Sequence, residues 1–146
     1  MGAKFRVLVA SQSFGKADPE PIRLLESAGC ELIRLQTKRP LKDEEIAQLV
    51  AKKGIHGIIA GLDEIGPLTL ASKTLKAVSR HGTGVDNIDF EAAKRYNVTI
   101  TNTPSTNASG VADLVMCLIL ALSRRLIEVH HCLQNDGWER PVGLEL

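Results

Sequence analysis

The order of apolar and amphipathic segments predicts an α/β fold of the flavodoxin-like, doubly wound class, with five parallel strands in one sheet. Five short apolar runs of strand length recur between residues 5 and 103. Segments with apolar residues at helical spacing separate these runs. Strands that alternate with helices form parallel sheets covered on both faces, and strands this short favour the flavodoxin-like arrangement.

The first half of the pattern supplies two strands and two helices. Residues 5–11 and 31–36 are the predicted strands, and residues 18–29 between them have the spacing of a helix. Residues 42–54 predict a second helix, with acids early and lysines late, as the helix dipole favours. Its early acids are interpreted as a solvated helix start: Asp43, Glu44 and Glu45.

The second half continues the alternation with three strands. These are predicted at residues 56–61, 75–80 and 98–103, with a short helix candidate at 68–74. A further helix over 89–97 is expected to begin at an N-cap and to end at a residue that tolerates the left-handed conformation. Those two residues are Asp89 and Asn97.

After Pro104 the pattern changes to one long helix of about seven or eight turns, starting near Asn107 or Ser109. Nearly every residue from 111 to 122 is apolar, whereas a surface helix has one apolar stripe. A five-stranded domain covers one side of such a helix, so another domain, another subunit or both must cover the rest. The alternative is an ordinary core helix of a compact fold.

Composition and charge exclude several classes of function. The net charge is +1 and aromatic residues make up 3% of the chain, which argues against nucleic-acid binding. The three cysteines lack CxxC spacing and fit reduced thiols in the cytoplasm. The apolar run of about 12 residues is too short for a membrane span, which needs about 20. No metal site is expected, because no histidine has further ligands at suitable spacing.

The segment SRHGTGVDNID, residues 79–89, has a Gly-x-Gly spacing after a predicted strand. A dinucleotide fingerprint needs a third glycine, and Asn87 stands there instead. A tight turn and a ligand loop both remain open from the glycines alone. Arg80 before them favours a carboxylate or phosphate ligand, since a guanidinium binds such groups through charge-assisted hydrogen bonds.

Other polar residues have simpler structural interpretations. His81 is either a ligand contact or a local hydrogen-bonding residue, and His56 before a strand is interpreted as structural. Asp89 is expected to cap a helix and Asp86 to hold the turn. No catalytic triad or nucleophile elbow is present in the sequence.

Three polar segments follow predicted strands and are expected at the carboxyl edge of the sheet. They are residues 60–64, 80–84 and 101–107. Ligands of doubly wound folds bind outside this edge. The three segments are therefore predicted to converge on one crevice.

Three motifs in one order carry a resemblance to a known family. SRHGTGVDNID is followed by NTP with NASGVAD, and then by DGWER. Together these resemble the D-isomer-specific 2-hydroxyacid dehydrogenase family, densely over residues 75–138 and in layout over 5–71. Within the family, the branch of D-3-phosphoglycerate dehydrogenases is the most similar.

The resemblance implies a substrate-binding domain at residues 1–104. Residues 105–146 would then be the connecting helix and the start of an NAD-binding domain. The catalytic arginine, glutamate and histidine of the family lie at later positions, so none is expected within these 146 residues. The chain alone is predicted to be inactive, with NAD bound mostly by residues outside it. Residues 111–122 are expected to form a homodimer contact.

The resemblance also assigns roles at the glycine segment. Arg80 would hold the anionic end of the substrate, and the backbone from Gly82 to Gly84 would lie near its carboxylate. His81 is included among the substrate-binding residues, and Thr83 among both substrate and NAD contacts. One departure is Gly61 and Leu62, because the family often places an arginine after its third strand, and this leaves other 2-hydroxy acids open.

The activity implied is oxidation of 3-phosphoglycerate to 3-phosphohydroxypyruvate with NAD, at the start of serine synthesis. The substrate would be a small anionic 2-hydroxy acid or 2-oxo acid. Another dehydrogenase, such as a glyoxylate or hydroxypyruvate reductase, is the first alternative. The second is a non-enzymatic module that senses a small anion or NAD. Neither nucleic acid nor membrane is expected as a partner.

Overall fold

The chain divides into two compact units, Met1–Ser105 and Thr106–Leu146. The computed structural model describes residues 4–37, 39–135, 137–138 and 141–145. DGWER, the last of the family motifs, lies partly outside the described residues. Each unit is described by itself below.

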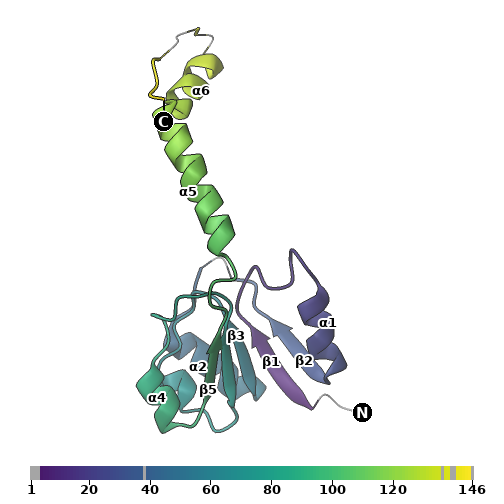
Figure 1. The fold of residues 1–146 in the computed structure, drawn as a ribbon. Helices are drawn as coiled ribbons and strands as arrows, with labels where there is room; N and C mark the ends of the chain where they lie inside the picture. Colours follow the sequence, from purple (N-terminus) through teal and green to yellow (C-terminus); the bar gives the residue numbers. More distant parts are fainter. Residues whose placement is uncertain (1–3, 38, 136, 139–140, 146) are drawn as a thin grey trace. The chain divides into compact units, whose positions relative to one another are not determined.

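The first unit is built on a sheet of five parallel strands (Figure 1). Their order across the sheet is β2-β1-β3-β4-β5, which is the flavodoxin-like order. The predicted fold class is therefore confirmed. The strands are β1 (Phe5–Val9), β2 (Cys30–Arg34), β3 (Gly57–Ala60), β4 (Ala77–Arg80) and β5 (Thr99–Asn102).

Four helices connect the strands: α1 (Glu20–Ser27), α2 (Asp43–Lys53), α3 (Pro67–Leu70) and α4 (Phe90–Arg95). The expected ends of α4 are confirmed. The Asp89 carboxylate accepts a hydrogen bond from the Ala92 N–H at 2.8 Å, as an N-cap does. Asn97 has a φ of 55°, in the left-handed region.

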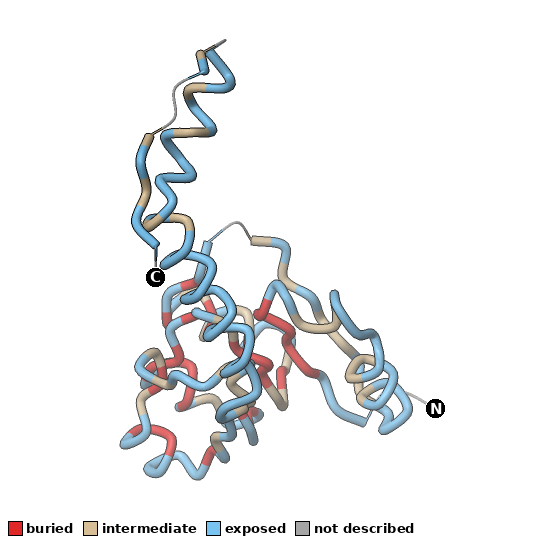
Figure 2. Tube along the Cα trace, turned by 45° about the horizontal axis from the view of Figure 1, so that its top comes forward, coloured by how far each residue is buried: buried red, intermediate tan, exposed pale blue. Residues whose placement is uncertain are grey.

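The core lies on both faces of the sheet, because alternate strand residues point to opposite sides. Leu8, Ile58 and Val78 are buried in the larger cluster, which includes residues of α2, α3 and α4. Val7, Val9 and Ile59 form a smaller cluster together with α1. Figure 2 shows the buried segments of this unit, which lie in strands and also in helices and the connections between them.

The interpretation of Asp43 as a solvated residue is wrong. Its side chain is buried and accepts hydrogen bonds from the N–H groups of Gly66 at 2.9 Å, Leu68 at 2.9 Å and Thr69 at 3.0 Å. Asp43 thus fixes the start of α2 to the start of α3. Glu44 is exposed, as expected.

In the second unit, the expected single helix is divided in two. Helix α5 (Ala108–Ser123) is followed by α6 (Leu126–Gln134). The break is at Arg125, whose φ of 52° is left-handed and incompatible with a continuous helix. An ion pair between Arg125 and Glu128 of the first turn of α6 accompanies this geometry, and it raises the pKa of the Arg125 guanidinium.

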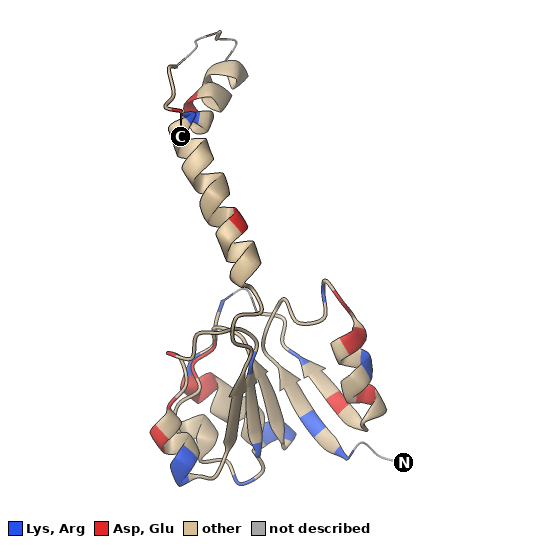
Figure 3. Cartoon of the chain, viewed as in Figure 1, with Lys and Arg blue, Asp and Glu red and all other residues tan. Residues whose placement is uncertain are grey.

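Helix α5 has no buried residue. Asp113 is its only charged residue (Figure 3), and the exposed fractions of Leu114, Met116 and Leu118 exceed one half. Across the described residues, no helix has both the length and the apolar character needed to cross a bilayer.

Candidate functional site

The three predicted segments meet at the carboxyl edge of the sheet through hydrogen bonds. We call residues 80–84 the glycine loop. Its His81 N–H donates to the Ala60 carbonyl at 2.9 Å, which joins it to the loop after β3. The Thr103 N–H donates to the Gly82 carbonyl at 3.1 Å, which joins it to the loop after β5. The three segments thus lie side by side at this edge, while a shared crevice between them stays a prediction.

Asn87 shows why the third glycine of a dinucleotide fingerprint is absent. Its side-chain amide donates to the carbonyl oxygens of Gly61, at 3.3 Å, and of Asp63. The residue therefore ties the segment after the glycine loop to the loop after β3. A glycine would lose both bonds, so this segment fits a braced loop better than a pyrophosphate cradle.

Arg80 ends β4, and its guanidinium folds back over the glycine loop. Nη1 donates to the His81 carbonyl. Nε is buried, and among the described residues no acceptor contacts it. An unpaired buried N–H costs about as much as a lost hydrogen bond, and such a group needs an explanation. Arg80 thus keeps hydrogen-bonding capacity that the described residues do not use.

Gly82 allows this position of Arg80. Its φ is +145°, a conformation that L side chains rarely adopt. A Cβ atom on Gly82 would lie 2.6 Å from Arg80 Nη1, so the guanidinium at the end of that flexible side chain would have to move. The first glycine of the loop is therefore required by its backbone conformation, and it also leaves room for the guanidinium in its present position.

Thr83 and Gly84 form the exposed tip of the loop. The Thr83 carbonyl accepts from the Asn102 amide at 2.9 Å, and its hydroxyl donates to the Thr103 carbonyl at 3.3 Å. The Gly84 N–H donates to no acceptor among the described residues. The tip is held from β5, and the exposed Gly84 leaves a backbone donor without an acceptor among the described residues, an arrangement suited to an anion.

His81 has a partner that the sequence did not indicate. Its Nδ1 is 2.8 Å from the Ser11 hydroxyl, in the loop after β1, and the two atoms share a hydrogen bond. Its ring also packs edge-on against Phe14, with 5.6 Å between ring centroids. Ser11 is buried. The loop after β1 is therefore a fourth part of the site.

Other predicted residues lie outside this group. The His56 ring nitrogen accepts from the Arg6 N–H at 3.1 Å, and its ring meets Phe5 edge-on, which agrees with a structural role. His130 and His131 belong to α6 in the second unit. Within the described parts of the chain, no cluster of three or more His, Cys, Asp or Glu residues is arranged to hold a metal ion.

The site and the sheet around it match a known family. The sequence profile described as D-isomer specific 2-hydroxyacid dehydrogenase, catalytic domain, matches residues 7–123 of the 146. The chain belongs to this family. The resemblance drawn from the sequence motifs is thereby confirmed.

Named relatives include more than one kind of dehydrogenase. D-3-phosphoglycerate dehydrogenase of Sus scrofa is 33% identical over 147 residues, which cover 99% of this chain and 26% of the relative. Hydroxypyruvate reductase of Thermotoga maritima is 30% identical over 104 residues, which cover 71% of this chain and 34% of the relative. The chain thus spans about a quarter to a third of the length of these relatives.

A solved structure agrees with both the fold and the family. The NAD+-bound 3-phosphoglycerate dehydrogenase of Entamoeba histolytica has a TM-score of 0.74 at 28% identity. The similarity covers 99% of this chain and 44% of that one. Contact of Arg80, His81, Gly82, Thr83 and Gly84 with a substrate or cofactor stays a prediction.

Proposed function

We propose that this chain is the substrate-binding part of an NAD-dependent D-2-hydroxyacid dehydrogenase that acts on 3-phosphoglycerate. The observation that carries the proposal is the glycine loop, where Arg80 Nε and the N–H of the exposed Gly84 have no acceptor among the described residues. The family match supports the reaction class. The similarity to phosphoglycerate dehydrogenases over nearly the whole chain supports the substrate.

Arg80 is proposed to bind the substrate carboxylate by exchanging its present acceptor, the His81 carbonyl, for the carboxylate. In the structure its Nη1 contacts the His81 carbonyl, a neutral acceptor. A carboxylate is a stronger acceptor for a guanidinium, and two parallel bonds fix its orientation. If Arg80 rotated toward an anion, its buried Nε could also gain an acceptor, which it lacks among the described residues. This residue positions the substrate and does not transfer a proton.

The glycine loop is suited to contacting NAD through one residue. It is not suited to binding the pyrophosphate of a dinucleotide. Asn87 fills the position of the third glycine and is already bonded to the loop after β3. Thr83 at the exposed tip is the residue proposed to touch the cofactor. When bound, NAD supplies the hydride acceptor for oxidation of the hydroxyl carbon. The part of this chain is to hold the carboxylate and to orient that carbon.

Hydroxypyruvate or glyoxylate reduction is the second candidate. It is favoured by the loop after β3, where Gly61 and Leu62 supply no cation for a phosphate. The similarity to the Thermotoga maritima hydroxypyruvate reductase supports it as well. Both candidates use a 2-hydroxy or 2-oxo acid carboxylate at Arg80, so they differ in the distal group of the substrate.

The apolar surface of α5 is proposed to pair with a second copy of the chain. Val111, Leu114 and Leu118 are each about half exposed, and one acid, Asp113, lies among them. Contiguous apolar surface of this kind marks an interface. A homodimer formed through residues 111–122 would remove these side chains from water.

The proposed activity is tested with the complete gene product. It is assayed for NADH formation with D-3-phosphoglycerate, and for NADH consumption with hydroxypyruvate and glyoxylate. The proposal expects the highest kcat/KM with the 3-phosphoglycerate couple. A higher value for an unphosphorylated acid selects the second candidate, and no turnover with any of them rejects both. The purified 146-residue chain is expected to be inactive in each assay.

A further inference from the structure

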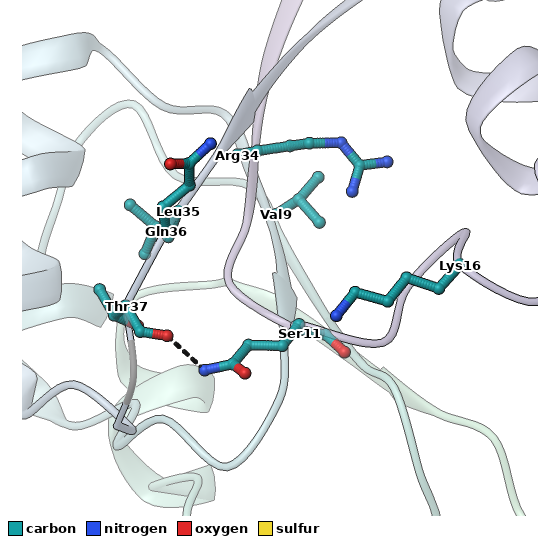
Figure 4. Close-up of a pocket in the computed structure, with 8 residues that line it drawn as sticks. Val9, Ser11, Lys16, Arg34, Leu35, Gln36 and Thr37 are labelled. Carbon is teal, nitrogen blue, oxygen red and sulfur yellow. Dashed lines mark hydrogen bonds between the residues drawn. The ribbon is translucent and has the colours of Figure 1, made fainter.

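A pocket separate from the glycine loop opens between the loops that follow β1 and β2. Its volume is about 260 Å³. Figure 4 shows the residues that line it: Val9, Ser11, Gln12, Lys16, Arg34, Leu35, Gln36 and Thr37. Ordinary pockets for drug-sized ligands hold about 300–1,000 Å³, so this one suits a smaller molecule.

The charged lining of the pocket is entirely cationic. Lys16 and Arg34 are its two charged residues, and no carboxylate lines it. Among the described residues neither cation forms an ion pair, although Arg6, Arg23 and Arg39 each do. Arg34 Nη1 donates a long and therefore weak hydrogen bond of 3.4 Å to the Phe14 carbonyl. Two cations that share a pocket repel each other until an anion joins them.

The remaining lining supplies neutral hydrogen-bonding groups and an apolar floor. Ser11 and Thr37 carry hydroxyls, Gln12 and Gln36 carry amides, and Val9 is buried beneath them. The Gln12 amide donates to the Thr37 carbonyl, which ties the loop after β1 to the loop after β2 across the pocket. The rim is therefore bridged by the protein itself.

Gly15 fixes the position of the loop after β1, which carries Lys16. Its φ of +72° is left-handed, and a Cβ there would collide with the Ile22 side chain and lie 3.4 Å from Arg34 Nη2. At Gly15 the backbone is thus packed closely against Ile22 of α1 and against the Arg34 guanidinium. Such fixed geometry lowers the cost of ordering side chains around a ligand.

We propose that this pocket binds a small dianion, a phosphate ester or a short dicarboxylate, through Lys16 and Arg34. The assignment follows from two unpaired cations, neutral donors beside them, no competing acid and a volume too small for a larger ligand. The site is distinct from the glycine loop, although the two are neighbours: Ser11 lines the pocket and bonds to His81, and Phe14 contacts both His81 and Arg34. The proposal that this pocket binds a dianion does not depend on the proposed dehydrogenase activity.

The test is an NMR titration of the 146-residue chain at pH 7.5, where phosphate is mainly the dianion. Backbone amide signals of Lys16 and Thr37 are followed with inorganic phosphate and, separately, with malonate. Sodium chloride keeps the ionic strength constant, because salt screens exposed charges. Saturable shifts with either probe support the site. Saturation by phosphate alone identifies the phosphate class, and saturation by malonate alone identifies the dicarboxylate class.

Variants separate a built site from general attraction. The double variant Lys16→Gln with Arg34→Gln is expected to weaken binding at least about tenfold, since each charged hydrogen bond carries that order of affinity. The matched control Arg23→Gln with Lys52→Gln removes the same charge from exposed positions on α1 and α2, and is expected to leave binding unchanged. Arg34→Lys keeps the charge and is expected to retain most of the affinity.

Three results would overturn the proposal. These are shifts with neither probe, shifts that never saturate, and equal weakening by the pocket variant and the control variant. The dispersion of the same spectra reports folding of each variant, and retained binding in Arg34→Lys guards against loss of fold as the cause. Arg80→Gln is expected to leave binding at Lys16 and Thr37 intact, so failure here is distinguishable from failure at the glycine loop.

Discussion

The hydroxyl of Ser11 and the imidazole of His81 share a hydrogen bond of 2.8 Å across 70 residues of sequence. The bond joins the loop after β1 to the glycine loop after β4. Strand β3 lies between β1 and β4 in the sheet, so the contact reaches over its carboxyl end. The site is therefore braced from several strands.

Replacing Ser11 by Ala is expected to lower the free energy of unfolding by about 1 kcal/mol, because a partly buried hydrogen bond is lost. The control is Ser13→Ala, whose hydroxyl is 3.5 Å from the same nitrogen and exposed. Urea denaturation of both variants measures the difference. Equal effects of the two substitutions would show that the Ser11–His81 bond does not stabilise the fold.

Gly82→Ala is expected to destabilise the first unit by about 1–3 kcal/mol, the usual cost of a non-glycine residue in a strained conformation. It should also displace Arg80, since the new Cβ would meet its Nη1. Gly84→Ala is the control in the same loop, because its Cβ would make an ordinary contact of 3.9 Å with Asp86. Thermal and urea unfolding compare the two variants, and an equally stable Gly82→Ala would refute the role given to Gly82.

Glu45 predicts an acid-dependent loss of stability. The bidentate Arg39 guanidinium, with help from the Lys42 N–H, lowers the pKa of the Glu45 carboxyl to about 2. A carboxyl with a lowered pKa stabilises the folded chain fully above its unfolded pKa, about 4.3. That contribution falls as the pH drops from about 4.3 toward 2.

The urea midpoint of the chain between pH 7 and pH 2 measures this effect, with Glu45→Gln for comparison. The variant should lack the part of the decline that belongs to this carboxyl. Glu44→Gln serves as the control, because Glu44 is an exposed neighbour in α2 whose carboxylate has no ion-pair or hydrogen-bond partner among the described residues. Identical pH profiles for Glu45→Gln and the unaltered chain would contradict the assignment.

Helix α5 predicts a concentration-dependent dimer. Leu118→Glu is expected to shift the 146-residue chain toward monomer, because a charge would be placed within the apolar surface. Leu62→Glu introduces the same charge at an exposed leucine of the first unit and should leave the mass unchanged. Light scattering after size-exclusion chromatography gives the mass. A monomer at every concentration of the unaltered chain would remove the proposed homodimer.

The sequence predicted the sheet well because its strands and helix ends have local causes. Asp89 caps α4 through its own side chain, and Asn97 adopts the left-handed conformation that ends the helical stretch. The apolar run around Ile58 is buried, as expected for a strand of a parallel sheet that is covered on both faces. These features depend on neighbours in the chain, so a pattern of residue types is enough to find them.

Other features depend on distant residues and have no local signal. Asp43 looks like any acid of a first helical turn, yet its partners lie more than 20 residues away. The break at Arg125 has neither Gly nor Pro, and arginine is a good helix former. Ser11 became part of the site only through the strand order, which brings its loop beside the glycine loop.

Steady-state kinetics of the complete gene product tests the central account most directly, with Arg80→Gln compared against Arg23→Gln. The account predicts that the Arg80 variant loses about 10- to 100-fold in kcat/KM for the 2-hydroxy acid, the range expected for a charged hydrogen bond. It should keep its unfolding midpoint and the Arg23 variant should keep its activity. Unchanged kcat/KM in Arg80→Gln, or a loss matched by unfolding, would contradict the account.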